Sequence, residues 1–268
     1  MLPTDSPLRE CWDKIGRASE HLKSLTDEFR TYIDAEPFRT IGRYAHKEAK
    51  YLLEFRDVKA MPTARWALIV GDCVHNARAA LDYIAWRCAG SCPTDWNTSF
   101  PILDSPNRGR FKSHTKRVHE GAATAIKALQ PYKRTHPKEQ PLWLLEELDA
   151  RDKHKLLTVI QGYLFGAEFT IKAPTGAKGV PTLHRDRSLK NGTVFAEVQF
   201  PMGTPKIKVK VNASLMPDIV FEESLGRNLS VFKHLNDILL AVERVVSHFD
   251  QLLAANPQWL KGRTVRTC

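Results

Sequence analysis

The sequence has few cysteines, no long apolar run and no leader-like start, and each absence limits where the protein works. Its 268 residues include five cysteines, an odd number, scattered along the chain. Disulfide-bonded secreted proteins pair their cysteines, so this pattern predicts a reducing compartment. No stretch approaches the roughly 20 consecutive apolar residues that a membrane-spanning helix needs. The first residues also lack the charged start and apolar run of a signal peptide. We therefore expect a cytoplasmic protein without a membrane partner.

Motifs that are typical of cofactor-binding or nucleophilic sites are also missing. The chain contains no phosphate-binding loop, no dinucleotide fingerprint and no serine or cysteine nucleophile motif. Cys88 and Cys92 are four apart without a second pair, so they do not predict a structural zinc site. A metal alternative uses carboxylates and imidazoles of two segments: Asp72, His75, Asp82, Asp152 and His154. Neither segment has the HExxH or paired ExxH spacing of helical metal sites. The sequence predicts no cofactor and no metal.

Positive charge is present in excess. The chain has 40 Lys and Arg against 30 Asp and Glu, a net charge of +10. A positive field attracts phosphates, so nucleic acid, with RNA favoured, is the expected partner. The most basic window, residues 108–119, carries Phe111 among its charges, as surfaces that follow a nucleic-acid backbone do. The candidate nucleic-acid surface consists of Arg108, Arg110, Lys112 and Lys116.

Hydrophobic periodicity predicts an α+β protein that is mainly α. Apolar residues recur at steps of three and four over residues 6–34, 64–90, 120–129, 141–159 and 230–254. They alternate with polar residues over 169–172, 194–200 and 206–211, which predicts a small antiparallel sheet. Residues 36–61 fit either a short strand or the end of a helix. We expect a single domain, a helical bundle of residues 1–160 and 225–256, with a β insertion at about 161–222 before the C-terminal helix. The pattern predicts no oligomeric state.

Residues 64–90 form the longest stretch in which one helical interpretation fits every position. One half of this helix is apolar and should face a core. The opposite half has acid, imidazole and amide groups, with a guanidinium on the flank: Asp72, His75, Asn76, Asp82 and Arg78. A second polar cluster follows some seventy residues later at 151–154, where Arg, Asp, Lys and His are consecutive. The two clusters hold more polar chemistry than a pair of packed helices requires.

The two clusters form the pattern GDxxHNxRxALDxxxW over 71–86 and DKHxxL over 152–157. This pattern resembles an uncharacterised family of actinobacterial and phage proteins, and the resemblance spans most of residues 64–160. It implies no particular activity. A weaker analogy is with the HEPN ribonucleases, whose mark is Arg, four to six residues, then His. Arg227 followed by His234 fits that mark. Chance alone yields about two such matches in a chain of this composition, so the analogy concerns the fold only.

Two functional hypotheses account for the polar clusters. In the first, the protein is a metal-independent ribonuclease of a bacterial or phage conflict system. A neutral imidazole takes a proton from a hydroxyl group, and a cation stabilises the charge that develops. The candidate catalytic residues are His75, His154, Asp72, Asp82 and Asp152, and the candidate phosphate-binding residues are Arg78, Arg151, Lys153 and Asn76. In the second, a non-catalytic binding or regulatory protein uses the polar face of the central helix for a partner or an anionic ligand.

A structural alternative stays open for each cluster. Arg78 with Asp82, and Glu147 with Arg151, have the spacing of i,i+4 ion pairs on a helix. In that case the polar groups satisfy one another within the bundle.

Overall fold

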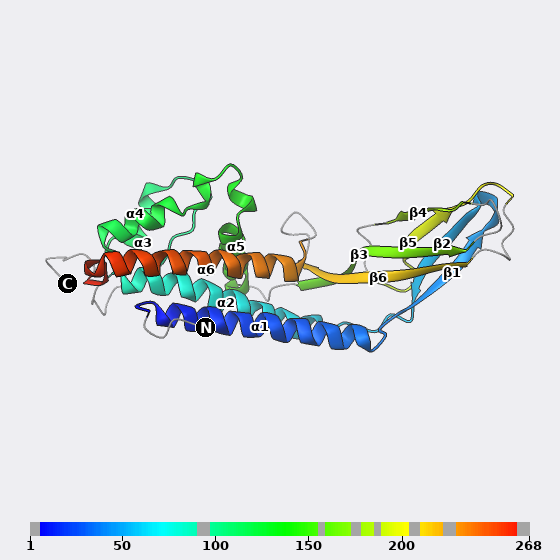
Figure 1. Cartoon of the computed structure of the whole chain (residues 1–268), viewed down its shortest axis with the longest axis horizontal. Helices are drawn as coiled ribbons and strands as arrows, with labels where there is room; N and C mark the ends of the chain where they lie inside the picture. Colours follow the sequence, from blue (N-terminus) through cyan, green and yellow to red (C-terminus); the bar gives the residue numbers. More distant parts are fainter. Residues whose placement is uncertain are drawn as a thin grey trace. The chain divides into compact units, whose positions relative to one another are not determined.

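A computed structural model describes residues 6–89, 97–154, 159–172, 178–184, 189–203, 210–221 and 229–261. The chain is an α+β protein, mainly α, as the sequence predicts (Figure 1). It divides into two compact units. The first comprises Met1–Leu25, Ala67–Leu157 and Phe232–Cys268, and the second comprises Thr26–Trp66 and Thr158–Val231.

The first unit is helical. It holds most of α1 (Arg9–Asp34) and α2 (Thr63–Arg87), and it holds α3 (Arg108–Thr115), α4 (Glu120–Ala128), α5 (Pro141–His154) and α6 (Val231–Ala255). Among its described residues the same unit has three short 3-10 turns: η2 (Pro131–Lys133), η3 (Pro137–Glu139) and η6 (Pro257–Lys261). The helices predicted from the apolar periodicity are therefore confirmed. Their bounds differ from the expected ones by a few residues, because helix ends depend on capping as well as on the apolar stripe.

Polar contacts join α1 and the residues just before it to α6 and α2. Trp12 Nε1 donates a hydrogen bond of 2.6 Å to Asp250 of α6, and Ser6 Oγ donates one of 2.5 Å to the same carboxylate. Lys14 Nζ donates to Asn76 Oδ1 of α2 at 3.1 Å. Ser6 Oγ also accepts the Leu8 N–H at 2.9 Å, as a serine at the start of a helix does.

The core of the helical unit follows the apolar stripe of α2. Val70, Val74, Ala77, Leu81 and Ile84 are all fully buried. Each fully buried Val, Leu or Ile side chain stabilises the fold by roughly 1.5–3 kcal/mol. This stripe therefore fixes how α2 is rotated and decides which of its polar residues face outward.

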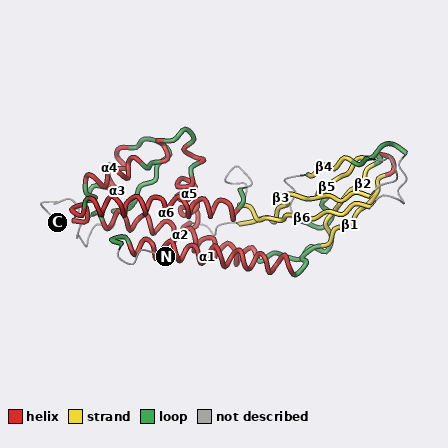
Figure 2. The backbone as a smooth tube through the Cα atoms, viewed as in Figure 1, coloured by secondary structure: helices red, strands yellow, loops and turns green. Residues whose placement is uncertain are grey.

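The second unit contains the strands. A four-stranded antiparallel sheet has the order β1-β2-β5-β4, formed by β1 (Arg39–Ala45), β2 (Lys50–Arg56), β5 (Val194–Gln199) and β4 (Val180–Leu183) (Figure 2). The 3-10 turn η1 (His46–Glu48) lies between β1 and β2. A second pair consists of β3 (Val159–Lys172) and β6 (Lys210–Phe221). Phe55 and Phe195, with ring centroids 4.4 Å apart, lie in the core of the four-stranded sheet.

The predicted β insertion at about 161–222 does not hold the whole sheet. Two strands, β1 and β2, come from residues 36–61, where the sequence left strand and helix both open. Pairing with a distant segment determines the strand conformation of β2, since Leu53 of β2 lies opposite Ala196 of β5 and both are buried. Asn191 and Gly192 form a turn before β5, and Gly192 has a φ of +77° that favours glycine.

None of the helices in the described parts of the chain combines the length and the apolar character needed to cross a bilayer.

Candidate functional site

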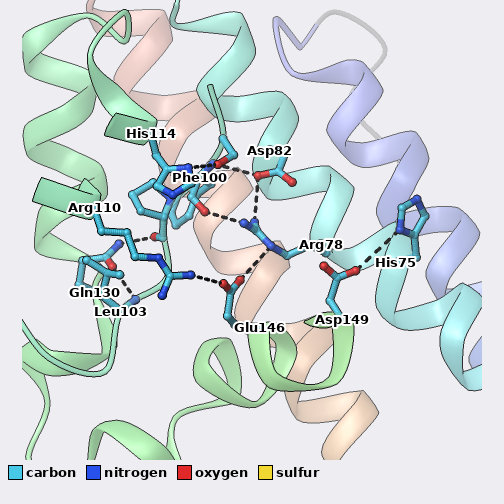
Figure 3. Close-up of polar contacts among 12 residues, drawn as sticks. His75, Arg78, Asp82, Phe100, Leu103, Arg110, His114, Gln130, Glu146 and Asp149 are labelled. Atoms are coloured by element: carbon cyan, nitrogen blue, oxygen red, sulfur yellow. Dashed lines mark hydrogen bonds and ion pairs between the residues drawn. The ribbon is translucent and has the colours of Figure 1, made fainter. Parts of the chain in front are cut away.

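The outward face of α2 presents His75 to solvent. Its side chain is 63% exposed, and Nδ1 lies 3.7 Å from Asp149 Oδ1 of α5. That separation is in the range of an ion pair and is longer than a hydrogen bond. The Asp149 side chain is only 6% exposed. The site therefore pairs an accessible imidazole with a buried carboxylate, and Figure 3 shows the other ring nitrogen of His75 pointing away from Asp149.

Asp149 is the residue that our sequence analysis missed. We looked for the partner of His75 among Asp72, Asp82 and Asp152, on the polar side of the helices. The overlooked signal is that Asp149 and Asp152 continue the buried stripe of Leu142 and Leu145 at steps of four and three. A carboxylate on the inward stripe of a helix is unusual and indicates a partner or a function.

Asp152 joins the same group of carboxylates. Burial raises the pKa of Asp152 above its ordinary value, and the nearby charges of Asp149 and Asp72 raise it further, whereas His75 lowers it. The close approach of α5 to α2 depends on Gly71, because a Cβ atom there would lie 2.7 Å from Asp152 Oδ1. The structure thus brings three predicted residues, Asp72, His75 and Asp152, into one electrostatic group with Asp149.

Arg78, which we predicted to bind phosphate, lies in a buried polar network. Its side chain is 9% exposed and lies between Asp82, with Nη1 to Oδ1 at 3.0 Å, and Glu146, with Nε to Oε2 at 3.2 Å. Its Nη2 donates a hydrogen bond of 2.8 Å to the carbonyl of Phe100 (Figure 3). The contact with Asp82 is an ion pair without hydrogen-bond geometry. A guanidinium held in this way has no open side for a phosphate, so the prediction of phosphate binding by Arg78 is corrected to a structural role.

Asp82 belongs to this structural network as well. One oxygen of its carboxylate accepts the Phe100 N–H at 2.9 Å and is also the atom that faces Arg78. The i,i+4 ion pair that was the structural alternative is therefore present. Its function is to hold the segment that follows Asn97 against α2. Buried Gln130 holds the next residues, since it accepts the Leu103 N–H at 3.0 Å and donates to the Pro101 carbonyl at 2.7 Å.

His114 of α3 completes the network on the other side of the Phe100 segment. Its Nδ1 lies 2.7 Å from Ser99 Oγ. Burial lowers the pKa of His114 below its ordinary value, and the positive charge of Arg110 lowers it further. The lowered pKa favours the neutral imidazole, whose Nδ1 can donate to the serine hydroxyl or accept from it.

The predicted nucleic-acid surface lies on and next to α3. Asn107 caps this helix by accepting the Arg110 N–H at 2.9 Å. Arg108, Lys112 and Lys116 are exposed, whereas the exposed Arg110 forms an ion pair of 3.1 Å with Glu146. This window is thus a solvated basic face that is linked, through Glu146, to the Arg78 network.

The remaining predicted residues have varied positions. Asn76 uses its side chain within the protein, because it donates to the Asp72 carbonyl at 2.8 Å and accepts from Lys14. Arg151 lies half-buried in the last turn of α5. Lys153 and His154 end α5, but their side chains lie outside the described residues, so the proposed approach of His154 to His75 stays a prediction.

Within the ranges that the structure describes, no group of three or more His, Cys, Asp or Glu side chains is placed to hold a metal ion. The fold and site define an α+β, mainly helical protein with an exposed histidine beside a buried aspartate. Comparisons with family models, with curated proteins and with solved structures give no match. The resemblance noted in the sequence and the HEPN analogy therefore both stay predictions.

Proposed function

We propose that the protein acts on nucleic acid, RNA in the first place, as a metal-independent ribonuclease in which His75 accepts the proton and Asp149 orients its imidazole. The observation that carries this proposal is the exposed imidazole held beside a buried carboxylate, 63% against 6% side-chain exposure. A carboxylate beside Nδ1 orients the ring and stabilises the imidazolium that forms when Nε2 accepts a proton.

The surrounding charges support a general base. Asp72, Asp149 and Asp152 form one electrostatic group with His75. Like charges placed so close together destabilise a fold, and such clusters are typical of functional sites. In RNA, the 2′-hydroxyl lies next to the scissile phosphate, and a base that removes its proton starts cleavage. His75 is our candidate for this base, and His154 remains the candidate acid.

Positive charge on the same helix pair supports attraction of the substrate. Lys14 of α1 donates to Asn76, the residue that follows His75 in the sequence. The exposed cations of the α3 window and the net charge of +10 favour phosphate-rich partners in general. Lys14 takes over the phosphate-binding role that we had predicted for the buried Arg78.

Cleavage of a labelled single-stranded RNA by the purified protein tests the proposal. We expect His75→Ala to lower the rate roughly 100-fold or more, because a general base contributes about 10²–10⁴-fold. Asp149→Asn should lower it less, since it removes only the orienting charge. His248→Ala, which alters an exposed histidine of α6, is the matched control and should leave the rate unchanged. A substrate with 2′-deoxyribose throughout should not be cut. Equal rates for the wild type and His75→Ala would contradict the proposal.

A second candidate function is non-catalytic binding through the same helix. Tyr83 and Trp86 are exposed on α2, at 38% and 42%, and Lys14 Nζ lies 6.0 Å from the centre of the Tyr83 ring. Exposed aromatic rings beside a cation are suited to stacking on unpaired bases. If this function is the correct one, Trp86→Ser weakens RNA binding, which fluorescence anisotropy measures. Neither the wild type nor Trp86→Ser then cleaves the RNA.

A further inference from the structure

The helical unit contains a cavity of about 300 Å³ between one face of α6 and the segment that leads from α4 into α5. On α6 it is lined by residues at positions 237, 240, 241, 244 and 245, a spacing that places them on one face of the helix. Its volume is at the lower end of the roughly 300–1,000 Å³ that is typical of small-molecule sites. The cavity shares no lining residue with the group around His75.

Two arginines line the cavity from opposite sides. Arg134 comes from the chain just after η2, and Arg244 comes from α6. Within the described part of the chain, neither guanidinium has a carboxylate at ion-pair distance. The acid in the lining, Asp237, is bound by Lys233 at 2.6 Å, so its charge is already neutralised. The cavity therefore has an excess of positive charge.

The rest of the lining is largely apolar. Pro131 and Leu142 are buried, and Leu240 is 41% exposed beside them. An exposed leucine next to a cavity loses its contact with water when a ligand fills the space, which favours binding of an apolar group. The lining thus combines a hydrophobic wall with two guanidinium groups.

We propose that this cavity binds a small organic anion, in which a phosphate or carboxylate group is attached to a hydrophobic body. Arginine matches both acidic groups because its planar fork donates two parallel hydrogen bonds to a pair of oxygens. The first turn of α5 lines the cavity through Pro141 and Leu142, and the N-terminal end of a helix adds partial positive charge. The apolar wall accommodates the body of the ligand. This binding function goes beyond RNA cleavage and does not depend on it.

Isothermal titration calorimetry with four probes tests the proposal on the full chain: phenyl phosphate, benzoate, inorganic phosphate and benzyl alcohol. We expect one or both of the aromatic anions to bind with a stoichiometry of one, and the affinities of the two identify the preferred acidic group. Inorganic phosphate lacks the hydrophobic body and benzyl alcohol lacks the charge, so both should bind at least tenfold more weakly. His75→Ala should bind as the wild type does, which separates this site from the proposed nuclease site.

Variants locate the binding. Arg134→Gln and Arg244→Gln should each weaken the binding of the aromatic anion tenfold or more. Lys133→Gln is the matched control, since it removes an equal charge next to Arg134 from a side chain that lies over the Tyr132 ring and does not line the cavity. Three results would overturn the proposal: no saturable binding of either aromatic anion, equal binding of the neutral probe, or unchanged affinity in both arginine variants.

Discussion

The substitution Arg78→Met removes the one guanidinium that joins Asp82, Glu146 and the Phe100 carbonyl. Methionine is unbranched, fits a buried site and replaces the aliphatic part of the arginine side chain, so the change deletes the guanidinium and its charge. Asp82 and Glu146 then lose their shared cation, and the Phe100 carbonyl loses its donor. The helices α2 and α5 and the segment after Asn97 are therefore all affected by one substitution.

The size of the effect follows from burial. Removing one partner of a buried ion pair costs roughly 3–5 kcal/mol when the other charge is left without compensation. Asp82 loses the guanidinium beside it, whereas Glu146 keeps its pair with Arg110. The two carboxylates keep some contact with water, at 29% and 26% side-chain exposure, which places the expected loss near the lower end. We expect Arg78→Met to lower the free energy of unfolding by about 3 kcal/mol.

Urea unfolding followed by circular dichroism in the helical band measures this loss, since the first unit holds most of the helices. Arg110→Met is the matched control, because Arg110 binds the same Glu146 at 3.1 Å but is 54% exposed. An exposed pair of this kind contributes at most about 1 kcal/mol. If the two variants lose the same amount, or if Arg78→Met loses less than about 1 kcal/mol, the structural role that we assign to Arg78 is wrong.

Three other predictions concern glycine, histidine and cysteine positions. Gly71→Ala should lower stability by roughly 1–3 kcal/mol, because its Cβ would lie 2.7 Å from Asp152 Oδ1. Gly109→Ala, where the nearest atom is 3.6 Å away, should instead raise stability slightly, and urea unfolding compares the two. The lowered pKa of His114 means that the unfolded chain takes up a proton more readily than the folded protein. Stability should therefore fall as the pH decreases below 6.5, the ordinary pKa of histidine. In His114→Asn the dependence of stability on pH should be weaker. An unchanged profile would contradict this. Burial raises the pKa of the Cys11, Cys73 and Cys88 thiols to about 12, so iodoacetamide should not alkylate them before the protein unfolds. Peptide mass spectrometry measures the labelling, and alkylation of these cysteines in the folded protein would contradict the prediction.

The candidate site shows how far prediction from the sequence reaches. Asp72, His75 and Asp152, which belong to the two predicted segments 71–86 and 152–157, lie in one electrostatic group. Their catalytic roles stay predictions. The partner of His75 was missed. Asp149 was overlooked because we expected functional carboxylates on the polar side of a helix, whereas this one follows the inward stripe of Leu142 and Leu145.

The sheet shows where such prediction fails. Residues 39–56 have no clear alternation, since Leu52 and Leu53 are adjacent in the same strand. Their extended conformation depends on partners far along the chain, including the antiparallel pairing of β2 with β5. Pairs that are distant in sequence leave little local signal, so a propensity argument does not find them.

The amino-acid sequence by itself determined the helices, because the spacing of apolar residues along a segment is a local property that burial alone explains. It also determined the excess of positive charge and the polar face of the central helix. Tertiary structure decided which polar groups on that helix are accessible. Arg78 and His75 are less than one turn apart, yet Phe100 and Glu146 cover the first and leave the second exposed. Whether a polar side chain serves the fold or faces solvent depends on the segments that pack over it, and this packing brings together residues that are far apart in the chain.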